Sequence, residues 1–128
     1  MANGTIAFDT LSTSGQISGT AVSVDADYLA YGSAKAWLRL NGTGTIAIRD
    51  SFNIASNTDN ATGTTITAFT NVFNNDEFAT TGMHSSTAFS MQVVVSNTVG
   101  SVKFRTLDAS GSLIDDPAHS ITIHGDLV

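Results

Sequence analysis

Short strand-like segments alternate with turn clusters along the whole 128-residue chain. The clusters NGTG (41–44), NTVG (97–100) and ASGS (109–112) supply the glycine and asparagine that turns with positive φ require. The chain is also rich in small polar side chains, with 18 Thr, 15 Ser and 9 Asn. Threonine suits a pleated sheet, whereas serine and asparagine compete with helical hydrogen bonds. We therefore expect an all-β fold, a compact antiparallel β-sandwich or jelly-roll-like domain.

The alternation predicts strands whose ends are defined to within about two to four residues. These strands are Thr5–Phe8, Gln16–Val22, Lys35–Leu40, Thr45–Ile54, Thr64–Phe69, Phe78–Met83, Phe89–Asn97, Ser101–Asp108 and Ser120–His124. Two other stretches are expected to be irregular. SNTDNATG (56–63) reads as a turn, and DADYLAYGS (25–33) forms at most one helical turn, because apolar residues do not recur there at helical spacing.

The charge balance limits the possible partners. Five Lys and Arg stand against 11 Asp and Glu, for a net charge of −6, which excludes nucleic acid and anionic membranes because binding phosphates needs clustered cations. The absence of cysteine removes disulfides, thiolate metal sites and cysteine nucleophiles. The start, MANGTIAFDT, has no signal-peptide features, and no apolar run reaches the roughly 18 residues of a membrane span. We expect synthesis in the cytoplasm and no membrane insertion.

Few residues suit catalysis or metal binding. His84 is distant in sequence from His119 and His124, and alternation in the last strand places His124 on the solvent side. The stretch DNATGT (59–64) has one carboxylate, Asp59, where a calcium loop needs several, so we interpret it as a turn. The adjacent carboxylates at 115 and 116 point in opposite directions in an extended chain. We expect no enzymatic activity, no metal site and no cofactor.

The segment WLRLNGTGTIAIR (37–49) predicts a hairpin whose loop length decides which side chains meet. A loop of two or four residues would set a lone arginine among apolar neighbours, pairing Trp37 with Ile48 and Arg39 with Ile46. A three-residue loop, 42–44, with Gly44 in the left-handed region, pairs Leu40 with Ile46, Leu38 with Ile48, Trp37 with Arg49 and Arg39 with Ala47. We favour this second register, because burying an unpaired guanidinium costs several kcal/mol.

In the favoured register the core receives Leu38, Leu40, Ile46 and Ile48, and Trp37 lies beside cations on the opposite face. Three interpretations of that face stay open: a subunit or capsid interface, the inner wall of a second sheet, and a sugar-stacking platform. The candidate contact residues are Trp37, Arg39, Arg49 and, in the loop before the tryptophan strand, Tyr28 and Tyr31.

A longer ordered pattern runs through SAKAW (33–37), NGTGT (41–45), AIR (47–49), SFN (51–53) and TDN (58–60). The lead-in VSVDADYLAYG (22–32) and the closing SITIHGDLV (120–128) fit the same pattern. Together they resemble the C-terminal fibre or knob module of bacteriophage tail-fibre-like virion proteins, over about residues 20–128. Such modules commonly end a long fibre. Here only about twenty residues precede the module. We therefore expect that another protein extends it away from the particle, or that no extension is needed.

The resemblance implies a position on the virion surface, assembly as a homotrimeric knob, and contacts with other capsid or tail proteins or with host-surface glycans. A small sheet protein with free edges gains by closing them against symmetry mates. We expect one β domain over residues 1–128, with 1–20 as an attachment segment or strand.

Two functions follow from these observations. The first is a non-enzymatic phage structural protein, a short fibre-like or decoration protein of capsid or tail that attaches through several weak copies. The alternative is a free carbohydrate-binding β-sandwich that stacks sugars on Trp37, Tyr28 or Tyr31.

Overall fold

The computed structural model describes residues 16–18, 23–84, 90–93 and 96–128. The strand expected at Thr5–Phe8 lies outside these residues, as do parts of those expected at Gln16–Val22 and Phe89–Asn97. The chain forms two compact units, Met1–Ser33 and Ala34–Val128, which are described separately below. The larger β unit therefore begins at Ala34.

The first unit contains one small sheet and one short helix. β1 (Gln16–Ser18) pairs antiparallel with β2 (Ser23–Asp25), and α1 (Ala26–Gly32) follows directly. The expectation of at most one helical turn at 25–33 is wrong, since α1 has seven residues. Asp25 caps the helix by accepting a hydrogen bond from the backbone N–H of Asp27 at 3.3 Å. The helix is thus stabilised by a local cap, and it is too short for apolar residues to recur in it at helical spacing.

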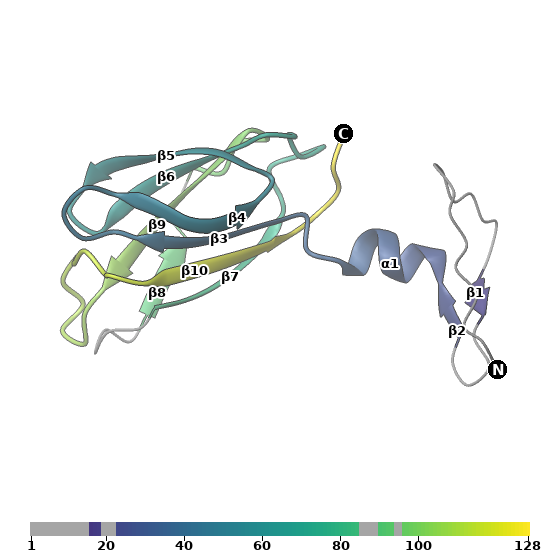
Figure 1. Ribbon diagram of the computed structural model, residues 1–128, viewed down its shortest axis with the longest axis horizontal. Coiled ribbons are helices and arrows are strands. Elements are labelled where there is room, and N and C mark those ends of the chain that lie inside the picture. The colour runs from purple at the N-terminus through teal and green to yellow at the C-terminus, as the bar shows by residue number, and fades with distance from the viewer. Residues whose placement is uncertain (1–15, 19–22, 85–89, 94–95) are drawn as a thin grey trace. The chain divides into compact units, whose positions relative to one another are not determined.

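The second unit is an antiparallel β-sandwich, which confirms the expected fold class. One sheet has the strand order β4-β3-β10-β7 and the other β5-β6-β9-β8. Figure 1 shows the two sheets stacked on each other. The strands are β3 (Ala36–Asn41), β4 (Ala47–Phe52), β5 (Ile54–Ala61), β6 (Thr64–Phe69), β7 (Ala79–His84), β8 (Ser90–Val93), β9 (Ser101–Leu107) and β10 (His119–His124).

The core lies between the two sheets and follows the two-residue period of the strands. Alternate residues of β3, β9 and β10 are buried, and a cluster of three phenylalanines closes one end of the core. The rings of Phe69 and Phe73 lie 4.9 Å apart, centre to centre, and those of Phe73 and Phe78 lie 4.7 Å apart. The core also takes in threonine: the buried hydroxyl of Thr67 donates to Asn57, and that of Thr106 donates to the Ile114 carbonyl. Hydrogen bonding of this kind allows a hydroxyl-rich sequence to build an interior.

The β3–β4 hairpin forms, but its predicted register is wrong. Leu40 lies opposite Ile48, and the loop runs over 42–46 instead of 42–44. Gly44 does take the expected left-handed conformation, with φ +65°. The loop is longer because it is anchored elsewhere: the Gly42 N–H donates to the backbone carbonyl of Asp116 at 2.8 Å, just before β10. A contact 74 residues away in sequence therefore sets the loop length.

A bulge at Arg49 shifts the rest of the hairpin by one more residue, so that Trp37 lies opposite Phe52 and Arg39 opposite Asp50. The predicted partners of Trp37 and Arg39, which were Arg49 and Ala47, are both replaced.

The new register also changes the expected core of the hairpin. Leu38 and Leu40 are buried at 2% and 0% exposure, as predicted, and Ile46 packs against the core while partly exposed. Ile48 is 40% exposed, so its assignment to the core is wrong. The physical reason is its place on β4, which is an edge strand of its sheet within the described part of the chain.

The segment predicted as one strand at Thr45–Ile54 is divided by Asn53, which has a left-handed φ of 56°. Strand β5 then includes most of the segment 56–63 that was expected to form a turn. The chain reverses direction only at residues 62–63. The polar side chains of β5 are mostly exposed, because β5 is the edge strand of the second sheet. A solvated edge strand has no apolar alternation, which is why the sequence pattern resembled a turn.

Replacing Gly63 by alanine is expected to destabilise the second unit by about 2–4 kcal/mol. A Cβ atom there would stand 2.7 Å from the backbone N of Ile114 and from the backbone O of Thr106, at a φ of +60°. Gly44→Ala is the matched control, since its φ is +65° but nothing lies within 4 Å. That variant should lose only about 1 kcal/mol. Urea unfolding measures both, and equal losses would show that crowding at Gly63 is unimportant.

Candidate functional site

Two rows of side chains cross the outward face of the sheet β4-β3-β10-β7. The strand register defines each row, from β4 across β3 and β10 to β7. The first row is Phe52, Trp37, Thr122 and Thr81, and the second is Asp50, Arg39, Ser120 and Met83. Small hydroxyl residues, Ser120 and Thr122, thus lie over β10 in both rows, beside the larger side chains of β3 and β4. On β7 the second row ends in Met83, and the first row ends in another small residue, Thr81.

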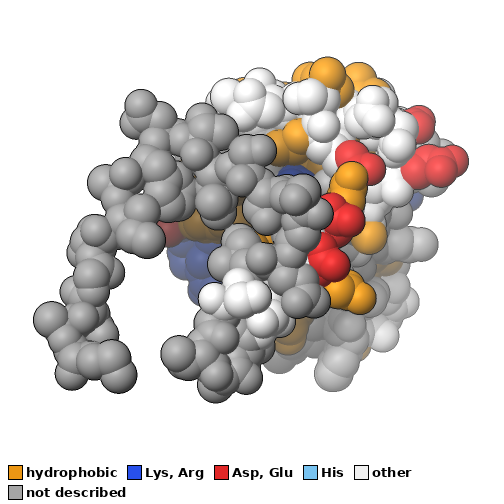
Figure 2. Space-filling view, turned by 90° about the vertical axis from the view of Figure 1, so that its right-hand side faces the viewer, with side chains coloured by type: hydrophobic (Ala, Val, Ile, Leu, Met, Phe, Trp, Pro, Cys, Tyr) orange, Lys and Arg blue, Asp and Glu red, His pale blue; other side chains and the backbone are white. Residues whose placement is uncertain are grey.

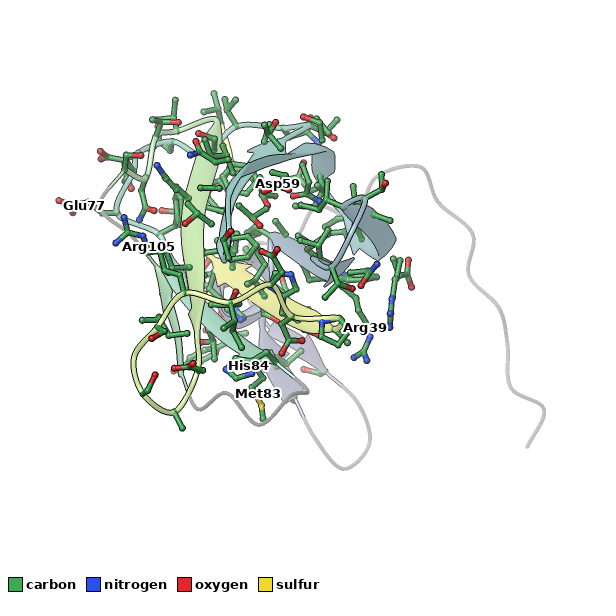
Figure 3. All side chains as sticks on the ribbon, turned by 90° about the vertical axis from the view of Figure 1, so that its left-hand side faces the viewer. Arg39, Asp59, Glu77, Met83, His84 and Arg105 are labelled. Carbon is green, nitrogen blue, oxygen red and sulfur yellow. The ribbon has the colours of Figure 1, made fainter. Side chains whose placement is uncertain are left out.

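This difference in size hollows the sheet face. A cavity of about 420 Å³ lies there, within the size range of small-ligand sites, and we call it the β10 trough. Arg39 on β3 borders one side, and Met83 on β7, which is 76% exposed, borders the other. Figure 3 shows the Arg39 and Met83 side chains extending outward near β10. The lining residues are Arg39, Thr81, Gly82, Met83, His84, Ala118, Ser120 and Thr122.

Arg39 supplies the positive charge of the trough. Its side chain is exposed, and among residues 16–18, 23–84, 90–93 and 96–128 no hydrogen bond or ion pair to its guanidinium is found. Asp50 is its cross-strand partner by register, but Asp50 Oδ1 accepts from the Ser51 N–H at 2.9 Å. Acidic side chains, red in Figure 2, are prominent on another side of the molecule, in line with the net charge of −6. A free guanidinium in such a molecule is a local attractor for anions.

The candidate contact residues separate into two groups. Trp37 is half-buried and Arg39 exposed on the outward face, while Arg49 is exposed at the bulge of β4. The other sheet packs on the opposite side, against Leu38 and Leu40, so the interpretation of Trp37 as the inner wall between two sheets is wrong. Tyr28 and Tyr31 belong to α1 of the first unit, where they are 76% and 63% exposed.

A buried polar cluster lies on the inner side of the same sheet. His84 Nδ1 is 3.5 Å from Asp116 Oδ2, with side-chain exposures of 3% and 0%. His119 lies opposite His84 by register and is also buried, with its ring edge-on to Phe104 at 5.4 Å between ring centres. His84 Nδ1 and both ring nitrogens of His119 make no hydrogen bond within the described part of the chain. Burial of these rings favours a structural role, and His84 also borders the β10 trough.

The residues that carry the phage-fibre resemblance mostly shape the backbone. Asn53, at positive φ, donates to the carbonyls of Lys35 and Asn71 at 3.0 and 3.1 Å and accepts from the Asn71 N–H at 2.7 Å. In the same way Asn41 binds the backbone and hydroxyl of Thr43 within the hairpin loop. These two asparagines therefore support the connections between strands, and neither of them lines the β10 trough.

Sequence reasoning missed most of the trough, namely Thr81, Met83, Ala118, Ser120 and Thr122. Of the lining residues, only Arg39 was among the candidate contact residues, and His84 had been considered only for metal binding. The signal for the others is the pairing of β10 with both β3 and β7, which joins segments about 40 and 80 residues apart. No local pattern in the sequence carries that information.

Comparisons with models of known protein families, with curated proteins and with solved structures give no match. Within the described residues, no cluster of three or more histidine, cysteine or acidic side chains is arranged to hold a metal ion. No helix in that part of the chain is both long and apolar enough to cross a membrane. The function must therefore be argued from the sheet surface itself.

The buried ring of His119 is expected to make the fold acid-sensitive. Burial lowers its pKa from the ordinary 6.5; the Asp116 carboxylate opposes this shift and His84 adds to it, with Asp115 a lesser opposing charge. The unfolded chain therefore takes up this proton at higher pH than the folded chain. The resulting stability is complete above pH 6.5 and is lost as the pH falls through the lower pKa of the folded state.

Urea unfolding over a range of pH measures this effect. His119→Leu should flatten the loss of stability on acidification, because it removes the titrating ring. Ile121→Val on the same strand is the control, and should cost about 1 kcal/mol at every pH. An unchanged pH dependence in His119→Leu would contradict the assignment.

Proposed function

We propose that this protein is a non-enzymatic structural protein of a bacteriophage particle, a short fibre-like or decoration protein on the surface of the capsid or tail. It assembles as a homotrimer, contacts neighbouring virion proteins, and contributes to attachment to the host surface. The resemblance of residues 20–128 to phage fibre modules is one support. The observation that carries the proposal is the exposed edge of the sheet at β4.

The β4 edge combines a free strand with exposed apolar side chains. Phe52 is 53% exposed on the outward face, where Trp37 lies opposite it, and Ile48, on the inward side of the same strand opposite Leu40, is 40% exposed. Free strand edges invite pairing, and exposed large apolar side chains gathered at one place mark contact surfaces. A ring of copies closes such an edge by symmetry.

The chemistry of the second unit supports a binding role over a catalytic one. Its histidines at positions 84 and 119 and the carboxylate at 116 have buried side chains, which suits a structural role. Another carboxylate, Asp115, accepts a hydrogen bond from the Gly63 N–H at 2.6 Å and so supports a turn. The accessible groups on the sheet face include hydroxyls, the Arg39 guanidinium, the Asp50 carboxylate and apolar side chains, which suit recognition.

The assembly can be tested by light scattering after size-exclusion chromatography. We expect a particle of three chains of 13.3 kDa each. Phe52→Ser should shift it to monomers while keeping the far-ultraviolet β signature, because Phe52 is already half exposed. Leu113→Ser is the matched control, a 39% exposed residue that bridges to Leu107 in the other sheet, and should leave the trimer intact.

Antibody labelling of the phage particle in the electron microscope tests the location, with labelling expected on the capsid or tail surface. A protein that is strictly monomeric, absent from the particle and able to bind sugar would overturn the proposal in favour of the free carbohydrate-binding module.

A further inference from the structure

We infer that the β10 trough binds a carboxylate-bearing sugar unit, such as the hexuronic acids of acidic polysaccharides, with Arg39 as the group that recognises the carboxylate. The inference rests on the proposed function, because it names the chemical class of surface to which the particle would attach. The β4 edge is assigned to subunit contacts, and the trough lies over β10 and β7, on the side of the sheet away from that edge.

Arg39 determines the anionic part of the ligand. A guanidinium presents a planar fork of donors that matches a carboxylate through two parallel hydrogen bonds. Arg39 borders the trough with no partner among the described residues, so its donors are available to a ligand. One cation in the trough matches one carboxylate, whereas a polyphosphate would need several cations.

The remaining lining determines the sugar part. Thr81, Ser120 and Thr122 bring three hydroxyl groups to the sheet face, each able to donate and to accept a hydrogen bond, as sugar hydroxyls require. Met83 and Ala118 offer apolar contact to the C–H groups of a sugar ring.

A neutral sugar and a bare carboxylate each match only half of this surface. A neutral sugar would offer Arg39 only uncharged hydroxyl oxygens, which make weaker hydrogen bonds to a guanidinium than a carboxylate does. A simple carboxylate such as acetate would pair with Arg39 but leave the hydroxyls and Met83 unused. The combination of groups therefore favours an acidic sugar over either component alone.

Isothermal titration calorimetry on the full chain tests this with trigalacturonate as the probe, and with galactose and acetate as partial ligands. We expect trigalacturonate to bind at least tenfold more tightly than either. Arg39→Gln should weaken trigalacturonate binding at least tenfold, and Arg39→Lys should weaken it by less. Thr122→Val, which keeps the side-chain shape and removes one hydroxyl, should weaken the sugar severalfold without changing acetate binding.

Arg105→Gln is the matched control, because it makes the same charge change on β9 in the other sheet, away from the trough. It should bind trigalacturonate within twofold of the unmodified protein. Since Arg39 is exposed, its variants should keep the unmodified unfolding midpoint, which separates loss of binding from loss of fold.

Three results would overturn the inference: no binding of trigalacturonate, equal binding of galactose or acetate, or equal weakening by Arg39→Gln and Arg105→Gln. Particle labelling distinguishes this failure from failure of the proposed function. A protein that is present on the particle but does not bind the acidic sugar keeps its structural role and loses only the assigned ligand.

Discussion

The central position of β10 is the constraint on which the second unit depends. β10 is the last strand in the chain, yet it lies inside its sheet, bonded on one side to β3 and on the other to β7. Ile121 and Ile123 on its inner side are buried in the core, and Ser120 and Thr122 on its outer side form the floor of the trough. One strand therefore connects the packing of the sandwich to the shape of its surface, through the alternation of side chains across a pleated sheet. Without β10 the strands β3 and β7 would have no common neighbour in this sheet.

β10 also separates the buried ionisable groups on the inner side of the sheet from the exposed groups on its outer side. His119 begins β10 and is buried beside Phe104, while the next residue, Ser120, opens to the trough. The segment before β10 also holds the β3–β4 loop, through the hydrogen bond from Gly42 to the Asp116 carbonyl. Ionisable groups on the inner side thus support the fold, whereas Arg39 on the outer side remains available to a partner. This separation favours recognition over acid–base chemistry as the use of the surface.

Much of the fold could be predicted from the sequence, and the failures share a cause. The strands near Lys35–Leu40, Thr64–Phe69, Ser101–Asp108 and Ser120–His124 were expected close to their observed bounds, because each is buried on one face and alternates accordingly. The edge strand β5 was taken for a turn, since solvated strands lack that alternation. Helix α1 was missed because it is short and depends on a cap at Asp25. Of the trough, only Arg39 was found, since its other residues are ordinary in sequence and meet only through strand pairing.

The sequence by itself determined the class of fold and the face of each core strand. Hydroxyl-rich, β-branched segments between glycine and asparagine turns form sheets, and a period of two places Leu38 and Leu40 on one face of their strand and Trp37 and Arg39 on the other. Only the tertiary structure decided which side chains meet. The loop of the first hairpin is held by Asp116, and a bulge at Arg49 then moves Phe52 opposite Trp37. Register depends on contacts between distant segments, and their free energy appears only when the two sheets close on a common core.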